Sequence, residues 1–301
     1  MKAECSAIIA VDVRMSRVRD WMRLVKLPIS LMNAVATVAG YALCTSTVEP
    51  ALILSALSVG LLACGCAALN NYQDRKMDAC FPRTRQRPLP RKAILPGPAL
   101  ACAVLLILCG VTGLWVSQPS HYAAGLGIMA VFLYNGLYTP LKYKTILAVI
   151  PGAMCGMLPP LIGWVSAGGN TPVSHILLLM AIIGVWQLPH FWLILLVDAP
   201  FYCSTDMPNM LHLFSVRQLH RLLFIWVLAF ASMAMFLPVI QVITNFWLGW
   251  LLVSCLVIVS VLISSILRIR KRTNRSYAFY FNWLNSSIGI VLMVIPLDRW
   301  F

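Results

Sequence analysis

The chain has 301 residues, is 60% hydrophobic and only 11% charged, and carries a formal net charge of +14. Soluble globular domains are about one quarter charged, so this composition excludes a soluble fold and indicates an integral membrane protein. Such a positive charge is also found in nucleic-acid-binding proteins. Its distribution along the chain, described below, favours contact with membrane lipid instead, and we expect no nucleic-acid partner.

Nine apolar stretches are each about long enough to cross a hydrocarbon core of ~30 Å. These stretches lie at 27–47, 51–71, 96–117, 121–140, 146–166, 173–197, 220–242, 245–267 and 277–297. The sequence therefore predicts an all-α, polytopic fold. It has two parts, a polar N-terminal segment at 1–26 and a transmembrane domain at 27–301.

The loops between these stretches alternate between basic and uncharged. One set carries 22 of the 23 Lys and Arg residues and consists of 1–26, 72–95, 141–145, 198–219 and 268–276, with Arg221 just beyond. The intervening loops carry none, and the remaining cation is Arg299. By the positive-inside rule the basic loops face the cytoplasm. We expect a multi-pass protein of the inner (cytoplasmic) membrane with a cytosolic N-terminus.

The central part of every stretch lacks Asp, Glu, Lys and Arg. Charges inside the membrane mark ion and proton pathways. Their absence argues against a transporter of an amphipathic anion, the alternative from a different functional class. The acidic residues lie instead outside these central parts, and four of the nine are in the two loops that follow the second and sixth stretches.

The region from Asn70 to Pro90 has the most distinctive chemistry. If the second helix continues into it, Asn71, Asp74 and Asp78 fall at i, i+3 and i+7 and share a face. Seven cations lie between Arg75 and Lys92. Mg²⁺ takes one or two carboxylates and completes its shell with waters and phosphate oxygens, while Arg and Lys neutralise the remaining phosphate charge. The region therefore indicates a Mg²⁺–diphosphate site; the alternative is a solvated loop facing anionic lipid.

Further candidates lie in two other loops on the same side. A lysine pair beside tyrosine and threonine hydroxyl groups, Lys142 and Lys144, suits diphosphate binding. The residues that we assign to the diphosphate are Arg83, Arg87, Lys142 and Lys144. The catalytic candidates are Asn71, Asp74, Asp78 and Lys142, and the metal candidates are Asn71, Asp74, Asp78, Asp198 and Asp206. The last two carboxylates belong to the second acidic loop, and the alternative is that both are simply solvated.

The sixth stretch contains Trp186-Gln187-Leu188-Pro189-His190-Phe191, the most polar point inside any stretch. Gln187 and His190 are at i and i+3 and share a face. The aromatic neighbours can line an apolar pocket or stabilise a carbocation. The candidate residues for such a pocket are Tyr138, Trp186, Gln187, His190 and Phe191. The alternative is a packed, hydrogen-bonded histidine.

The fifth stretch is rich in helix breakers, namely Pro151-Gly152, Gly156, Pro159-Pro160 and Gly163. Freed backbone groups in a membrane need a neighbour or a cavity. We therefore expect an irregular helix that lines a cavity.

The pattern Asn-Asn-Tyr-x-Asp-Arg-x-x-Asp from Asn70, followed by Arg-Thr-x-x-Arg-Pro-Leu from Arg83, resembles the first aspartate-rich motif of the UbiA-type intramembrane prenyltransferases. Its form is similar to the protoheme IX farnesyltransferase (haem O synthase) branch. Three more pieces are similar to that branch, at Tyr138 to Thr145, Gly156 to Trp164, and Trp186 to Phe191. The resemblance covers nearly the whole chain.

The resemblance implies nine transmembrane helices around a central cavity. It also implies Mg²⁺-dependent transfer of a farnesyl group from farnesyl diphosphate to the vinyl group of protoheme IX (haem B), which gives haem O. Under this resemblance, Tyr138, Trp186, Gln187, His190 and Phe191 are assigned to the acceptor and the prenyl chain. One departure is that the family's Asp-Tyr in the second acidic loop falls on Phe201-Tyr202. Two related alternatives stay open: a prenyltransferase with a quinone-ring or other acceptor, and an impaired homologue that binds haem.

Overall fold

The computed structural model describes residues 17–81, 84–117, 121–170, 173–199, 202, 207–267 and 274–301. Within these ranges, nine helices are long and apolar enough to cross a membrane. They confirm the nine predicted stretches, and the described residues contain no β-strand.

The first part of the bundle contains α2 (Leu27–Cys44), α3 (Pro50–Asp78), α4 (Pro96–Ser117), α5 (Tyr122–Val131) and α7 (Val149–Ser166). The second part contains α8 (Ser174–Val197), α10 (Val216–Val239), α11 (Phe246–Ser264) and α12 (Asn274–Trp300). Short elements extend or connect these helices: the π-helix η1 (Phe132–Tyr138) and α6 (Thr139–Leu141) after α5, and the 3₁₀-helices η2 (Ile146–Ala148), η3 (Met210–His212) and η4 (Ser265–Leu267). Residues 17–24, which we call the surface helix, precede α2.

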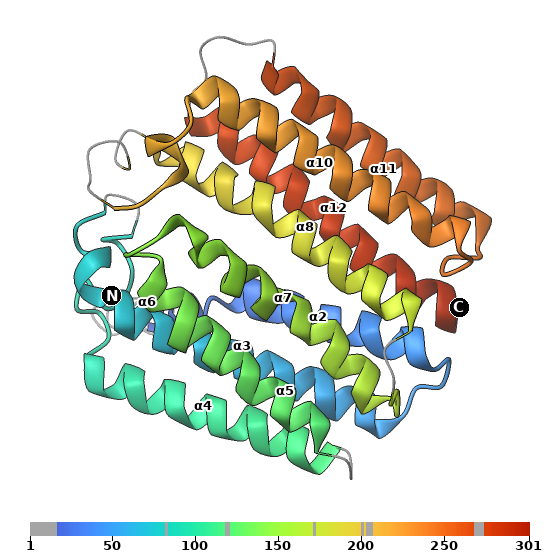
Figure 1. The fold of residues 1–301 in the computed structure, drawn as a ribbon. Helices are drawn as coiled ribbons and strands as arrows, with labels where there is room; N and C mark the ends of the chain where they lie inside the picture. Colours follow the sequence, from blue (N-terminus) through green and yellow to red (C-terminus); the bar gives the residue numbers. More distant parts are fainter. Residues whose placement is uncertain are drawn as a thin grey trace, which may run out of the picture.

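The long helices form a closed ring in chain order. Each packs on the next one, and α12 returns to pack on α2. Helices that are not neighbours in this order also pack on each other, most extensively α2 on α7 and α8 on α12. Figure 1 shows the two parts side by side, with α3, α4, α5 and α7 on one side and α8, α10, α11 and α12 on the other.

The contact between α2 and α7 is close enough to require glycine. A β-carbon at Gly40 would lie 1.9 Å from the Pro160 carbonyl oxygen, and one at Gly163 would lie 1.9 Å from the Thr37 carbonyl oxygen. Small residues permit this approach of two helix backbones in a membrane. α7 itself is a continuous α-helix with Pro159 and Pro160 inside it. The expected irregular helix is therefore wrong for most of this stretch, and Pro160 and Gly163 serve close packing on α2.

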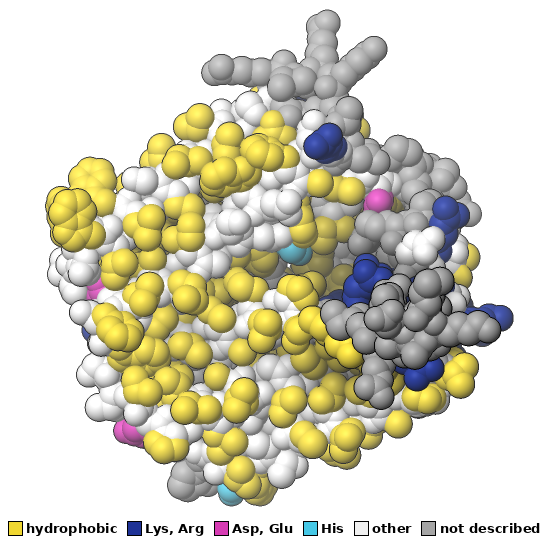
Figure 2. All heavy atoms as spheres, turned by 180° about the vertical axis from the view of Figure 1, so that it is seen from behind, with side chains coloured by type: hydrophobic (Ala, Val, Ile, Leu, Met, Phe, Trp, Pro, Cys, Tyr) yellow, Lys and Arg dark blue, Asp and Glu magenta, His cyan; other side chains and the backbone are white. Residues whose placement is uncertain are grey.

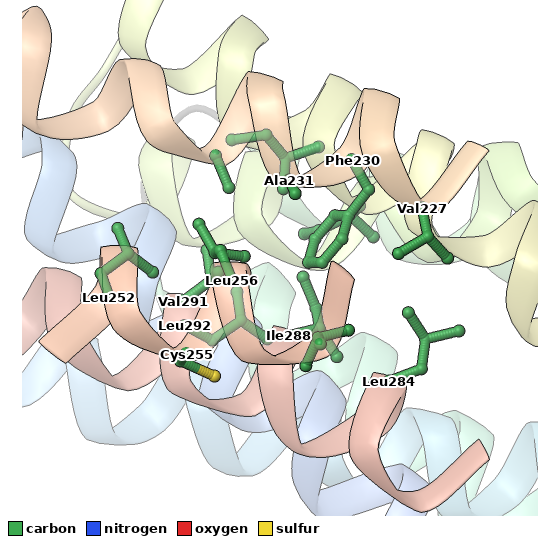
Figure 3. Close-up of a cluster of buried hydrophobic side chains, with 14 of the residues drawn as sticks. Val227, Phe230, Ala231, Leu252, Cys255, Leu256, Leu284, Ile288, Val291 and Leu292 are labelled. Carbon is green, nitrogen blue, oxygen red and sulfur yellow. The ribbon is translucent and has the colours of Figure 1, made fainter. Parts of the chain in front are cut away.

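The largest group of buried apolar side chains lies between α8, α10, α11 and α12. Figure 3 shows Phe230 of α10, Leu256 of α11 and Ile288 of α12 meeting there. The outer surface is also apolar, and Figure 2 shows Lys and Arg gathered mainly towards one end of the molecule. Apolar side chains both inside and outside are typical of a bundle in lipid, where helices associate through van der Waals packing.

Candidate active site

The site is built on the last turns of α3. This helix has 29 residues, so it is about 43 Å long and extends beyond a hydrocarbon core of ~30 Å. Its continuation to Asp78 confirms the helix on which the predicted arrangement depends. Asn71 and Asp74 are each 3% exposed and Asp78 is 6% exposed. Carboxylates this buried need counter-charges and hydrogen bonds.

Asp74 has three partners from two segments. Lys142 forms an ion pair with its Oδ2. Tyr143 donates its hydroxyl hydrogen to Oδ1 at 2.6 Å, and the side-chain amide of Asn70 donates to Oδ2 at 2.9 Å. The short connection after α6 therefore brings the predicted Lys142 to the predicted Asp74.

Asp78 is paired with Arg87 from the loop that follows α3. One guanidinium nitrogen of Arg87 lies 2.7 Å and 3.0 Å from the two carboxylate oxygens, and it also donates to Asn71 Oδ1 at 3.3 Å. The Thr84 hydroxyl donates to the Asp78 carbonyl oxygen at 2.9 Å, which ties this loop to the end of the helix.

Lys26 is a third cation of the site and was not among the assigned residues. It precedes α2 in a left-handed conformation with φ 47°, and its ammonium group donates to Asn70 Oδ1 at 2.7 Å and to the Tyr134 hydroxyl at 3.5 Å. Burial, with the nearby charges of Arg87 and Lys142, lowers the pKa of Lys26 to about 7. A lysine with so low a pKa regains its proton readily when an anion approaches.

The two Asp74 partners after α6 have shifted pKa values too. Burial lowers the pKa of the Lys142 ammonium, although the Asp74 carboxylate opposes this. Burial and the hydrogen bond to Asp74 raise the pKa of the Tyr143 hydroxyl. Two carboxylates thus face Arg87 and Lys142, and Lys26 beside them can take up a proton, so this network can accept further negative charge.

The π-helix η1 aligns the connection with α3. The Asn135 amide donates to the Cys66 carbonyl oxygen at 3.0 Å, and the Gln73 amide donates to the Asn135 carbonyl oxygen at 3.0 Å. One turn later, Thr139 accepts a hydrogen bond from Asn70 at 3.0 Å. Single turns of π-helix occur frequently at functional sites. No pattern in the sequence predicted this one.

Four of the five predicted acceptor residues, Trp186, Gln187, His190 and Phe191, lie on α8 and divide into two groups, whereas the fifth, Tyr138, ends η1. Gln187 is 7% exposed, and its amide donates to the Ala153 carbonyl oxygen of α7 at 3.0 Å. It packs against Gly156, where a β-carbon would lie 2.4 Å from Nε2. Trp186 donates to the Leu284 carbonyl oxygen of α12 at 2.9 Å. These two side chains therefore hold α8 against its neighbours.

His190 and Phe191 lie in an aromatic group. His190 Nδ1 is 2.8 Å from Asn285 Oδ1 of α12. With the Asn285 amide in this orientation its oxygen accepts, so the matching neutral tautomer of His190 has its proton on Nδ1 and a lone pair on Nε2. The rings of His190 and Phe281 are 4.9 Å apart, and those of Phe191 and Tyr138 are 5.9 Å apart.

Tyr138 contacts both the carboxylate–cation network at the end of α3 and the aromatic group of His190 and Phe191. Its ring stacks on Tyr134 with the centroids 5.5 Å apart, and the Lys142 ammonium lies 5.7 Å from its centroid. On the other side it meets Phe191 and packs close to Gly152, where a β-carbon would lie 3.0 Å from the ring. The structure therefore makes the carboxylate–cation network and the aromatic group one continuous site.

The remaining candidates are placed less centrally. Asp198 is partly buried just after α8, and its carbonyl oxygen accepts from the Tyr202 backbone at 3.2 Å. The rings of Tyr202 and Phe81 are 5.7 Å apart, so the second acidic loop approaches the end of α3. Lys144 is exposed. Arg83 and Asp206 lie outside the described residues.

The donor set fits Mg²⁺. Among the described residues, no three His, Cys, Asp or Glu side chains gather as a complete metal site. Mg²⁺ needs no such cage, because it is usually held by one or two carboxylates together with substrate phosphates and water. Asp74 and Asp78 supply hard oxygen donors beside cations that can bind phosphate.

The sequence missed Lys26, Asn70, Tyr134 and Tyr143 as site residues. A signal existed for two of them, because Asn70 stands beside the chosen Asn71 and Tyr143 stands beside Lys142. In the structure Asn70 contacts Asp74, whereas Asn71 donates to the Leu24 carbonyl oxygen at 2.6 Å.

Comparisons with known proteins identify the family. The family model for the UbiA prenyltransferase family matches residues 33–286. A curated relative from Nitratidesulfovibrio vulgaris, named protoheme IX farnesyltransferase, is 34% identical over 288 residues, which are 94% of this chain and 96% of the relative.

Two solved structures are similar in fold. An apo UbiA homologue from Aeropyrum pernix K1 has a TM-score of 0.71 at 18% identity and covers 89% of this chain and 98% of its own. A UbiA homologue from Archaeoglobus fulgidus, bound to GPP and Mg²⁺, has a TM-score of 0.66 at 14% identity and covers 92% of this chain and 99% of its own.

The bundle of membrane-length helices in the described part of the chain and the match to the family model together define an integral membrane prenyltransferase. The chain belongs to the UbiA prenyltransferase family. Within that family it is similar, over almost its whole length, to proteins named protoheme IX farnesyltransferase.

Proposed function

We propose that this enzyme transfers a farnesyl group from farnesyl diphosphate to the vinyl group of protoheme IX (haem B), with Mg²⁺ as cofactor, and so forms haem O and diphosphate. The observation that carries the proposal is the buried network in which Asp74 and Asp78 face Lys26, Arg87 and Lys142. The name of the relative that spans the whole chain supports the two substrates.

The diphosphate end of the reaction is assigned to this network. Asp74 and Asp78 would hold Mg²⁺, with Asn71 beside them, and Lys26, Arg87 and Lys142 would bind phosphate oxygens. Arg83 and Lys144 would add positive charge, and Asp198 or Asp206 would serve a second metal ion. When bound, Mg²⁺ neutralises the diphosphate and stabilises the charge that develops as it leaves.

The prenyl chain and the acceptor are assigned to the aromatic side of Tyr138, where they would occupy the centre of the bundle. At about 0.8 kcal/mol per buried CH₂, burying the farnesyl chain contributes roughly 10 kcal/mol at most. The faces of Tyr138 and Phe191 would stabilise an allylic cation, and the surrounding lipid-facing bundle excludes water that would hydrolyse it.

His190 is the assigned acceptor residue. Its Nδ1 is engaged by Asn285, so Nε2 is the atom that would ligate haem iron or bond a haem carboxylate. Gln187 and Trp186 would act indirectly, because their polar atoms bond α7 and α12.

We also propose an inner-membrane location with the N-terminus in the cytosol. The support is the arrangement of cations along the chain, with 22 of 23 on one set of loops. The site at the end of α3 would then face the cytosol, where prenyl diphosphates are soluble enough to reach it.

One experiment tests the activity. The purified protein is incubated with haem B, farnesyl diphosphate and Mg²⁺, and the product is identified by mass. A farnesylated haem supports the proposal. Diphosphate release that requires a quinone-ring acceptor instead of haem contradicts the acceptor, and binding of haem without any product contradicts the enzymatic assignment.

A further inference from the structure

The surface helix, residues 17–24, has two different faces. Asp20 and Leu24, one turn apart, point inward and are 6% and 0% exposed. The outward face carries three exposed apolar side chains, Val18 at 58%, Trp21 at 37% and Met22 at 46%. It also carries three exposed arginines, Arg17, Arg19 and Arg23. Exposed Trp, Met and Arg on one short helix are typical of a segment that lies on an anionic membrane surface.

The inward face is joined to the active site. The Leu24 carbonyl oxygen accepts the hydrogen bond from Asn71 at 2.6 Å. Lys26, two residues further on, donates to Asn70 at 2.7 Å. Asp20 forms an ion pair with Arg91, in the same loop as Arg87. The position of the surface helix therefore determines where Lys26 lies in the site and where the Asn71 amide lies beside Arg87.

A pocket of about 280 Å³ lies between the surface helix and the start of α4. Its lining includes Arg17, Asp20, Trp21, Ile94, Leu95 and Pro98. The guanidinium group can bind a phosphate, and the indole and the aliphatic side chains can contact the glycerol backbone and the first part of an acyl chain. The pocket thus combines the two chemistries of a phospholipid headgroup at one place.

We propose that the surface helix docks on anionic phospholipid headgroups, with one headgroup in the pocket beside Arg17 and Trp21, and that docking holds Lys26 and the Leu24 carbonyl in the active site. Anionic lipid then strengthens binding of the prenyl diphosphate. The evidence for docking is the exposed apolar and basic face of the surface helix together with the pocket. The effect on the diphosphate rests on the proposed function.

Docking is tested first, by a measurement that needs no activity. The protein is reconstituted in phosphatidylcholine vesicles that contain brominated phosphatidylglycerol or, in a parallel sample, brominated phosphatidylcholine. The fluorescence of Trp21 is obtained as the difference between the wild-type protein and Trp21→Phe. Stronger quenching by brominated phosphatidylglycerol is expected. Equal quenching by both lipids means apolar contact only and overturns the docking on anionic headgroups.

The coupling is tested by affinity for farnesyl diphosphate with Mg²⁺ in vesicles with and without phosphatidylglycerol. Each cation near an anionic surface contributes about a fivefold preference, so the wild-type affinity should rise by roughly fivefold or more in the anionic vesicles. The variant Arg17→Gln/Arg19→Gln/Arg23→Gln should lose this rise. The matched control Arg217→Gln/Arg221→Gln/Arg275→Gln removes three exposed cations elsewhere and should keep it.

The possible results separate the two ideas. Diphosphate binding that ignores the lipid, or that responds equally in both triple variants, overturns the coupling but leaves the proposed function intact. Absence of diphosphate binding in every vesicle, with preferential quenching of Trp21 still present, overturns the proposed function and leaves the docking standing.

Discussion

Replacing Asp74 by Asn is the most informative single change in the site. The carboxylate is 3% exposed and accepts hydrogen bonds from Asn70, Lys142 and Tyr143. Asp74→Asn keeps the shape but leaves the Lys142 ammonium without its counter-charge. Breaking a buried pair costs about 3–5 kcal/mol. Because the Lys142 side chain is 22% exposed, solvent should reduce the loss of stability to about 2 kcal/mol.

The turnover of Asp74→Asn should fall by more than its lower free energy of unfolding explains. A lost metal ligand, or a lost stabiliser of the leaving diphosphate, raises the barrier by a few kcal/mol, which is about 100-fold or more in rate. The assay is turnover of farnesyl diphosphate with haem B by purified, reconstituted protein, beside its thermal unfolding midpoint.

Two controls make the result decisive. Asp298→Asn removes a carboxylate that accepts hydrogen bonds from the backbone N–H groups of Thr244 and Asn245 and that is not part of the site. It should cost stability and leave turnover unchanged. Asp74→Asn/Lys142→Met replaces the pair with neutral groups and should recover stability without activity. Near wild-type turnover in Asp74→Asn would refute the diphosphate site.

Three other predictions follow from the same structure. A reporter that works only in the cytosol should be active when inserted in the 72–95 loop and inactive after Phe301; a cytosolic signal from the second fusion contradicts the topology. His190→Ala should weaken haem affinity and leave farnesyl diphosphate affinity nearly unchanged, whereas Gln187→Leu should lower the unfolding midpoint and affect both substrates alike; equal effects on both substrates in His190→Ala exclude its assignment. The pKa of Lys26 is about 7 in the folded protein and 10.5 for an ordinary lysine. Between these two pH values the unfolded chain binds more protons than the folded chain. The contribution of Lys26 to the free energy of unfolding therefore increases as the pH rises. Diphosphate binding at pH 8 should therefore take up protons, which calorimetry in two buffers measures, and Lys26→Arg should reduce that uptake.

Much of the fold was predictable because the bilayer dictates it. The nine stretches follow from the apolar length that a hydrocarbon core requires, and the structure confirms them. The continuation of α3 to Asp78 was also predictable, because the polar residues recur with the helical period. The apolar length that the bilayer requires accounts for the first result, and the helical period of the polar residues accounts for the second.

The partners within the site were less accessible to sequence reasoning. Asn70 and Asn71 both satisfy a helical spacing to the two aspartates, so periodicity alone could not choose between them. Lys26 meets Asn70 across 44 residues and Lys142 meets Asp74 across 68. Contacts at such separations depend on how helices pack. The π-helix η1 depends in the same way on Asn135 reaching Cys66 in α3.

The charges of the site connect its resting and loaded forms. Asp74 and Asp78 are already paired with Lys142 and Arg87. Under the proposed assignment, Mg²⁺ binding alone would leave these two cations without their carboxylate partners, and diphosphate binding alone would leave the two carboxylates without their cations. If both bound together, the carboxylates would hold the metal and the cations would bind phosphate oxygens, so every buried charge would keep a partner. Mg²⁺ and the prenyl diphosphate should therefore strengthen each other's binding reciprocally. Mg²⁺ titrations with and without an unreactive prenyl diphosphate analogue check this, and equal affinities would contradict the exchange of partners.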